Sequence, residues 1–357
     1  MPLGRYLVAH SKSVVSAQLS VVSMKGIKIV FTILVLCLAA QVSKAEWTKQ
    51  NTNSFAWYKD IFFLDQNKGW LVGTDGILNS TADGGTTWMQ TKKFTTDTIL
   101  QVYFESELNG WLLCERNMYA RGNNATSYLR RTTDGGLTWE KIEFEDGGRE
   151  RIVKLFFNMD GLGTAFGEGG VFYKLQEDGK TWKRSKTAIH YLLLDAAYAD
   201  EKVGAIVGTG GTILFTEDSG YTWEKATLLG DTDTRFNAVY FAGTKGAWAV
   251  GTRGRIFYSN GGGRLWRQQD STVTANLNDV YFTSVNNGWA VGDNGIIIRT
   301  RDGGKNWDDV PAKVTHKLEK ITFVGTRGWA IGFGGTLLTY SDTVGEPGAK
   351  PVLMKRS

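Results

Sequence analysis

Hydrophobic and polar residues recur in one pattern along residues 46–341. An alternating run such as residues 279–282 (DVYF) precedes a glycine-tryptophan run such as residues 288–292 (GWAVG). A glycine turn then leads into a third apolar run, residues 295–298 (GIII) in the same repeat, and an aspartate turn leads into a run that opens with tryptophan. Short alternating runs bounded by Gly and Asp are typical of β-strands, and helical spacing occurs nowhere inside the repeat. Each repeat therefore predicts four short strands.

The turn before each tryptophan follows the template T-x-D-x-G-x-T-W. Four segments fit it: residues 81–88, 132–139, 216–223 and 300–307, the last with Asn306 at the second Thr position. Residues 175–182 and 259–266 are worn copies, with Glu177 and Gly261 at the aspartate position. The six terminal tryptophans are spaced by 41 to 51 residues. Self-similarity at about 40 to 50 residues is typical of propellers and solenoids.

Because this turn recurs at one strand junction of the repeat, we assign it a structural role. An Asp carboxylate can accept backbone N–H groups within the turn, Gly can adopt a positive φ, and Trp offers a large face for packing. One carboxylate per copy is too few for a calcium loop, which needs several oxygen ligands. The residues with this assignment are Asp83, Trp88, Asp134, Trp139, Asp218, Trp223, Asp302 and Trp307.

The two ends of the repeat region complement each other. The glycine-tryptophan run occurs seven times, but the last copy, residues 316–341, has no tryptophan strand after it. Trp47 precedes Trp88 by 41 residues and is in phase with the repeat. Joining the ends in one sheet removes open edges. We therefore predict an all-β, seven-bladed β-propeller of four-stranded antiparallel blades over residues 46–345, closed by Trp47 and followed by a disordered tail, residues 346–357.

The first 45 residues are predicted to be an export signal rather than part of the fold. Lys25 and Lys28 precede the apolar run 29–40, and Ser43 and Ala45 supply the small residues that a signal peptidase reads. Cleavage after Ala45 would release the mature chain. The protein is therefore expected in the periplasm, or in the thylakoid lumen if the source is a phototroph.

Two further features of this segment bear on the export prediction. Residues 1–23 are interpreted as an upstream extension, because a usual signal peptide would begin at Met24. A lipid-attachment signal at Cys37 fits less well, because Leu36 stands where such signals prefer Gly or Ala. The mature chain is thus expected either free in its compartment or attached to the membrane.

Removal of this segment changes the charge of the protein. The sequence holds 41 Lys and Arg against 36 Asp and Glu, but residues 1–45 contain five of the basic residues and none of the acidic ones. The mature chain has 36 of each, so the basic excess that would suggest nucleic-acid binding disappears. Cys114 is the one cysteine after residue 45, so no internal disulfide is expected and we interpret it as a small buried apolar residue.

Residues that could carry catalysis are sparse. His190 and His316 are the only histidines after residue 45, and the sequence has no Cys/His cluster, no G-x-S-x-G elbow and no HExxH motif. Residues 208–211 (GTGG) resemble a dinucleotide fingerprint only superficially, because no helical pattern follows them. We expect no enzymatic activity, no cofactor and no metal.

Arginine is the remaining signal. Loops between blades and loops between the second and third strands of a blade lie on the same side of a propeller of four-stranded blades. Arg116 and Arg121 lie in a long loop of the second blade, residues 115–127, and the others lie in equivalent or inter-blade loops: Arg149, Arg235 and Arg253. Arg is enriched at recognition surfaces and suits carboxylate partners, although ordinary solvated charge is an equally open interpretation.

Together these motifs resemble one family. Glycine-tryptophan strands alternating with T-x-D-x-G-x-T-W turns behind an export signal are similar to the photosystem II stability/assembly factor family of Asp-box β-propellers, over residues 46–341. The resemblance implies a non-enzymatic lumenal factor that engages a newly made subunit of a membrane complex, partly through an arginine patch. On this chain that role would fall on Arg116, Arg121, Arg149, Arg235 and Arg253, which match by face alone.

Two other classes stay open. One is a periplasmic or cell-surface recognition module with an unrelated protein partner. The other is a sialidase-like glycoside hydrolase, which also carries Asp boxes but needs an arginine triad, a Tyr/Glu nucleophile pair and an early F/Y-R-I-P strand. The last motif is absent here, and such enzymes normally have six blades. In every case a monomer is expected.

Overall fold

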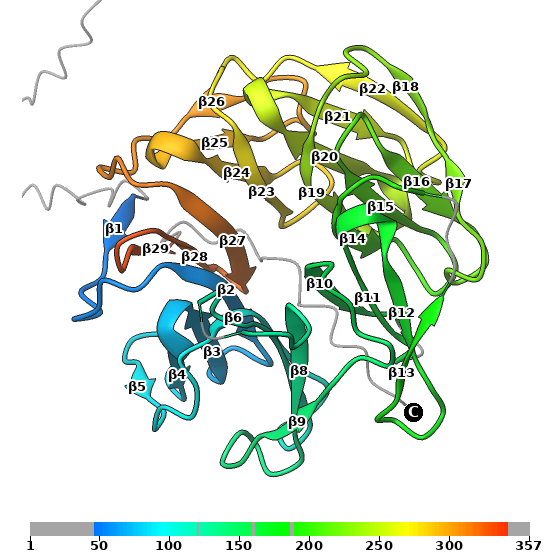
Figure 1. Ribbon diagram of the computed structural model, residues 1–357. Helices are drawn as coiled ribbons and strands as arrows, with labels where there is room; N and C mark the ends of the chain where they lie inside the picture. The colour runs from blue at the N-terminus through cyan, green and yellow to red at the C-terminus, as the bar shows by residue number, and fades with distance from the viewer. Residues whose placement is uncertain (1–45, 120, 159–160, 186–188, 342–357) are drawn as a thin grey trace, which may run out of the picture. The chain divides into compact units, whose positions relative to one another are not determined.

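Seven β-sheets surround a common centre (Figure 1). The computed structural model describes residues 46–341 except residues 120, 159–160 and 186–188, so the predicted signal peptide and the predicted C-terminal tail lie outside the described residues. Within them the fold is a seven-bladed β-propeller, and the predicted fold class is confirmed.

Each blade runs outward from the centre through four strands. The innermost strands are β2 (Tyr58–Phe63), β6 (Thr98–Phe104), β10 (Ile152–Phe157), β14 (Leu193–Tyr198), β19 (Phe236–Phe241), β23 (Leu277–Phe282) and β27 (Leu318–Val324). The second strands are β3 (Gly69–Gly73), β7 (Gly110–Glu115), β11 (Gly163–Gly167), β15 (Gly204–Gly208), β20 (Ala247–Gly251), β24 (Gly288–Gly292) and β28 (Arg327–Gly332). The third strands are β4 (Leu78–Thr81), β8 (Ser127–Thr132), β12 (Phe172–Leu175), β16 (Ile213–Thr216), β21 (Ile256–Ser259), β25 (Ile297–Thr300) and β29 (Leu337–Ser341). The outer strands are β5 (Met89–Gln90), β9 (Glu140–Ile142), β13 (Trp182–Ser185), β17 (Glu224–Lys225), β22 (Leu265–Gln269), β26 (Asp308–Asp309) and β1 (Trp47–Lys49).

The N-terminal strand closes the ring as predicted. β1 pairs antiparallel with β29, with Trp47 opposite Tyr340. The Trp47 side chain is buried, and its ring meets those of Trp289 and Tyr340 at centroid distances of 5.7 and 5.3 Å. The closing strand is therefore held by packing between blades 6 and 7 as well as by its ladder of hydrogen bonds.

Blade 5 departs from the predicted four strands. A fifth strand, β18 (Thr227–Leu229), pairs in parallel with the outer strand β22, while the other six sheets have four strands. β22 has five residues, and the unpaired N–H and C=O groups of its outer side would otherwise face solvent. Leu228 of the added strand also packs against the hydrophobic cluster between blades 4 and 5.

The recurring glycine-tryptophan pair has a packing explanation. The Phe282 ring ends the inner strand of blade 6 and stacks on Trp248 of blade 5 at a centroid distance of 3.6 Å. A Cβ on Gly288 would lie 2.3 Å from that ring, so only glycine leaves room for it. Trp70 and Phe104 repeat this stack between blades 1 and 2 at 3.7 Å. The glycine-tryptophan pair thus has a packing role between adjacent blades.

Candidate functional site

Two kinds of loop form one face of the propeller, which we call the 2–3 face. They are the loops between second and third strands and the loops that lead into each inner strand. In six of the seven blades an N–H of the first kind donates to a carbonyl of the second, as Thr252 does to Arg235 at 3.0 Å. The aspartate turns lie on the opposite face, where Gly135 donates its N–H to Leu108 in the loop between first and second strands.

Arg116 lies in the long loop of blade 2, but its side chain is only 8% exposed. Its guanidinium forms an ion pair with Glu143, donates to the Ala125 carbonyl at 2.6 Å, and lies 4.5 Å from the centroid of the Tyr128 ring. These contacts use the guanidinium to fix the loop against the inter-blade segment. Sequence alone could not separate this buried arginine from its exposed neighbours.

Arg121 and Arg149 are brought together at the junction of blades 2 and 3. Arg121 donates to the Thr126 hydroxyl at 2.7 Å, and that hydroxyl donates to the Arg149 carbonyl at 2.6 Å. The Arg149 residue is exposed and Arg121 is partly buried. Thr126 therefore holds two cationic residues from different loops beside each other on the 2–3 face.

Arg235 and Arg253 form a second group, at blade 5. Both residues are exposed; Arg235 contacts Asn237, and Arg253 approaches Asp231 at 3.3 Å. Arg255, which the sequence did not single out, also pairs with Asp231 at 2.9 Å. The N–H of Asp233 and these two arginines lower the pKa of Asp231. The predicted arginines thus share one face but fall into two groups, with Arg116 buried beside the first.

The aspartate turns have one repeated geometry. In the second blade Asp134 accepts the Thr138 N–H at 2.9 Å and the Thr138 hydroxyl at 2.5 Å, and the Thr132 hydroxyl donates to it at 2.7 Å. The Thr138 hydroxyl and N–H hold the pKa of Asp134 at about 2. The same carboxylate contacts recur at Asp83, Asp218 and Asp302. The hydrogen-bond partners of the Asp134 carboxylate among the described residues belong to its own turn, which supports a scaffold role.

The tryptophans of these turns differ in their hydrogen bonding. Trp139 donates its indole N–H to the Gly136 carbonyl at 3.1 Å. The buried indole nitrogens of Trp88, Trp223 and Trp307 find no hydrogen-bond partner among the described residues. The contribution that these tryptophan side chains share is therefore packing, because within the described residues only Trp139 of the four forms an indole hydrogen bond within its turn.

One worn copy keeps its carboxylate in a shifted position. In blade 3 Asp178, and not Glu177, accepts the Thr181 N–H at 2.8 Å and the Thr181 hydroxyl at 2.5 Å. These bonds set the pKa of Asp178 at about 2. The template places the aspartate at residue 177, which is Glu here. The accepting carboxylate instead belongs to the next residue, Asp178, which lies three residues before Thr181 rather than four.

Six of the seven inner strands carry a charged or polar residue at one equivalent position. Every inner strand shifts register near its start, after the second residue in β6 and after the first in the others. The residue beyond the shift is Asp60, Gln101, Lys154, Asp195, Ala238, Asp279 or Lys320. Lys154 pairs with Asp195 at 2.5 Å and Lys320 with Asp279 at 3.6 Å. This ring of residues could not be predicted from the sequence, because the residue at this position changes in charge and type from blade to blade.

Carboxylates of this ring also clamp the blades to one another. Asp279 accepts the Ile321 N–H of the next blade at 2.8 Å, and Asp60 accepts the Val102 N–H at 3.1 Å. Burial raises the pKa of Asp279 to about 6 and also raises the pKa of Asp60. Burial opposes the charge on Lys320, but Asp279, Asp60 and Asp195 raise its pKa. The ring is thus an interlocked set of ion pairs.

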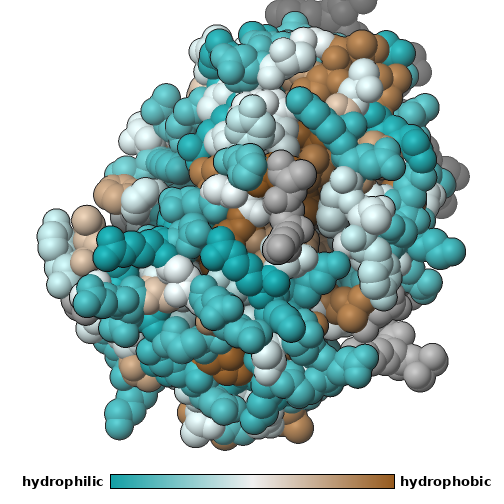
Figure 2. Space-filling view, turned by 45° about the vertical axis from the view of Figure 1, so that its right-hand side comes forward, coloured by the Kyte–Doolittle hydropathy of each residue, from teal (hydrophilic) through white to brown (hydrophobic). Residues whose placement is uncertain are grey.

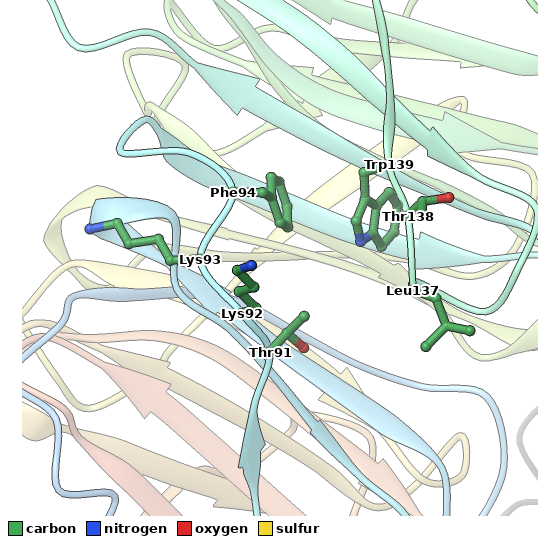
Figure 3. A pocket seen from close by; sticks show the side chains of 7 residues that line it. All are labelled: Thr91, Lys92, Lys93, Phe94, Leu137, Thr138 and Trp139. Atoms are coloured by element: carbon green, nitrogen blue, oxygen red, sulfur yellow. The ribbon is translucent and has the colours of Figure 1, made fainter.

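The pocket between blades 1 and 2 shows no acid–base pair. One pocket of about 220 Å³ lies between blades 1 and 2 and is lined by Thr91, Lys92, Lys93, Phe94, Leu137, Thr138 and Trp139. Figure 3 shows the Phe94 and Trp139 rings beside each other and Lys93 pointing away. The lining contains no acid or histidine that could pair with the lysines in acid–base chemistry.

Other functional groups are also missing from the described part of the chain. There, no three His, Cys, Asp or Glu side chains are placed to hold a metal ion, and the free Cys114 thiol is buried. Among residues 46–341, apart from the six that are not described, no helix is long and apolar enough to span a bilayer. Figure 2 shows mostly hydrophilic residues on the face in view, with hydrophobic residues in separate patches.

Seven blades, four of which carry an intact aspartate turn between the third and outer strands, define an Asp-box β-propeller. Residues 39–184, 175–270 and 264–348 match the family described as "Photosynthesis system II assembly factor YCF48", and the chain belongs to this family. The resemblance inferred from the glycine-tryptophan strands and aspartate turns is therefore confirmed.

Named relatives agree with this assignment. A photosystem II assembly lipoprotein Ycf48 of Picosynechococcus is 24% identical over 283 residues, which cover 66% of this chain and 82% of the relative. A solved structure titled "YCF48 bound to D1 peptide" is similar with a TM-score of 0.68 and 23% identity, over 83% of this chain and 95% of that one. "YCF48 from Cyanidioschyzon merolae" gives 0.67 and 24%, over 83% and 99%. At these identities the structures support the fold.

Proposed function

We propose that this chain is an exported, non-catalytic assembly factor that binds a protein subunit of a membrane complex through its 2–3 face. Family membership and the names of the relatives support this role. The similar structure "YCF48 bound to D1 peptide" holds a D1 peptide. A peptide of that photosystem II subunit is therefore the first partner to test. The role needs no cofactor, metal or nucleic acid, and the chain would act as a monomer.

The observation that carries the proposal is the pairing of Arg121 with Arg149 across Thr126, with Arg235 and Arg253 on the same face. Arg presents a planar fork of donors that suits carboxylates. Rim charges of this kind mainly raise the association rate and depend on salt. Arg116 would act indirectly, by holding the loop that presents Arg121. An acidic segment of the partner would lie across these loops.

The test reverses charge on three members of this set, of which Arg149 and Arg253 are exposed and Arg121 is partly buried. Arg121→Glu, Arg149→Glu and Arg253→Glu should each weaken binding of a D1-derived peptide about tenfold, an order expected when attraction becomes repulsion at an interface. Binding is measured by fluorescence anisotropy at several salt concentrations, with thermal melts to verify folding. Arg301→Glu is the matched control, because Arg301 lies in an aspartate turn on the opposite face and its side chain is 61% exposed. Equal affinity of all variants would contradict the proposal.

Export and location are tested separately. The mature protein should fractionate with the periplasm, or with the thylakoid lumen in a phototroph, and should begin near Glu46. Protease protection and N-terminal sequencing measure both properties. A chain that keeps its first 45 residues and stays in the cytosol would contradict this part of the proposal.

A further inference from the structure

Four aromatic residues gather on the 2–3 face where blade 7 meets blade 1. Phe333 begins the second-to-third loop of blade 7, and its ring lies 5.4 Å from that of Trp57 and 5.9 Å from that of His316. Phe55 lies in the same inter-blade loop as Trp57, two residues earlier. We call this set, Phe55, Trp57, His316 and Phe333, the closing-blade aromatic cluster.

The exposure of this cluster has no structural explanation. Phe55 is 94% exposed and Phe333 is 48% exposed. Phe333 uses only its backbone in the turn, donating its N–H to Lys317 and accepting from Thr336. The other blades place polar or charged residues at the first position of this loop: Thr74, Arg116, Glu168, Thr209, Thr252 and Asp293. The turn therefore does not require an aromatic side chain there, whereas a binding surface would use one.

Positive charge surrounds the cluster. The Lys59 ammonium lies 3.1 Å from the centroid of the Trp57 ring, and Lys317 lies 5.6 Å from it. Both ammonium groups share the single carboxylate of Glu319, each at 3.2 Å, which leaves a net positive charge. The two inter-blade loops that carry the cluster, residues 50–57 and 310–317, contain no acidic residue. A partner that covers these rings must tolerate, and would gain from, negative charge.

The cluster and the first arginine group share one face, with the loops of blades 1 and 2 between them. Blade 1 packs against blade 7 through one hydrophobic cluster and against blade 2 through another. One extended segment that crosses the loops of blades 1 and 2 would therefore meet the aromatic rings at one end and Arg121 and Arg149 at the other. Asp75, on the loop of blade 1 between them, disfavours a partner carboxylate at that point. The arrangement fits an acidic segment with a large apolar residue at one end.

We propose that the closing-blade aromatic cluster is the apolar anchor site for the partner peptide. It receives one large apolar side chain of an acidic, extended segment whose carboxylates face Lys317 and the arginines of blades 2 and 3. This inference rests on the proposed function and adds the specificity of the same face: the arginines attract the segment, and the aromatic cluster fixes its register.

The experiment separates anchoring from attraction by salt dependence. Overlapping synthetic peptides from the D1 subunit are titrated against the mature wild-type chain, and the tightest peptide is kept as the probe. Phe333→Ala and Phe55→Ala should raise its Kd about tenfold at every salt concentration, while the slope of log Kd against log salt stays as in the wild type. Arg149→Glu should instead change that slope. Tyr221→Ala is the matched control, because Tyr221 is 71% exposed in an aspartate turn on the opposite face.

Variants of the peptide complete a double-mutant cycle with the protein variants. Replacing its apolar residues by Ala one at a time should identify one position whose loss weakens binding to the wild type about tenfold but leaves binding to Phe333→Ala unchanged. Phe55→Ala keeps the test independent of folding, because so exposed a ring contributes little to the core. Wild-type affinity in both aromatic variants, with the arginine variants weakened, would overturn the anchor site and keep the proposed function. No binding of any peptide by the wild type would reject both.

Discussion

The aspartate turns are governed by single residues. A carboxylate that accepts two or three hydrogen bonds in its charged form is stabilised in that form, which is why the pKa of Asp83, Asp134, Asp178 and Asp302 is about 2. The template predicted the four intact turns because every member matches. It failed in blade 3, where the segment has the same length but the carboxylate that accepts from Thr181 belongs to Asp178. Counting in either direction points to Glu177, because residues 175–182 have the same length as an intact template, and the use of Asp178 appears only in the hydrogen bonds.

This shift gives a direct test at the residue scale. Asp178→Ala should lower the melting temperature at pH 7, because the Thr181 N–H and hydroxyl lose their acceptor, whereas Glu177→Ala should not. Folding lowers the pKa of Asp178, so its contribution to stability is present above the unfolded pKa near 4 and is lost as the pH falls toward about 2. The gap between Asp178→Ala and the wild type should therefore narrow from pH 5 to pH 3 in thermal melts followed by circular dichroism. A constant gap, or equal effects of both variants, would contradict the assignment.

At the scale of elements, ring closure depends on a strand of three residues. β1 contributes few backbone hydrogen bonds, but it places Trp47 among Trp289, Phe323 and Tyr340. The phase of the tryptophan repeat predicted this pairing, since the missing outer strand of one end was present at the other. The same reasoning could not predict β18, because its three residues carry no turn signal and pair with a neighbouring blade.

Trp47→Ala should therefore lower the free energy of unfolding far more than the three-residue length of β1 suggests. Removing a fully buried Trp costs about 3–5 kcal/mol of unfolding free energy, and the loss also opens the edge of β29. Thr48→Ala, one residue further along the same strand and exposed, should change stability by less than about 0.5 kcal/mol. Urea denaturation of the mature chain measures both values. Similar costs for the two variants would show that the ring does not depend on this closure.

At the scale of the whole molecule, the sequence predicted the features that every blade shares. It did not predict contacts made by residues that differ from blade to blade. Blade number, closure and the face of the arginines follow from period and strand direction, which each blade preserves. The burial of Arg116 depends on Glu143, far along the chain, and no periodic pattern contains that contact. The central ring could not be predicted for the same reason: a register shift common to all seven inner strands marks one variable position in each, and the ion pairs between these positions form only when the blades are assembled.

That ring predicts one further outcome. Asp279→Ala removes the acceptor of the Ile321 N–H and the closest partner of Lys320, which is partly buried and also lies near Asp60 and Asp195. Breaking a buried ion pair by removing one partner costs about 3–5 kcal/mol. Asp308→Ala, which breaks the exposed pair with Arg301, should cost less than about 1 kcal/mol. Adding Lys320→Met to Asp279→Ala should restore part of the loss, because an unpaired buried ammonium is then removed. Urea denaturation resolves these differences, and a double variant as unstable as the sum of its single changes would show that the two charges act independently.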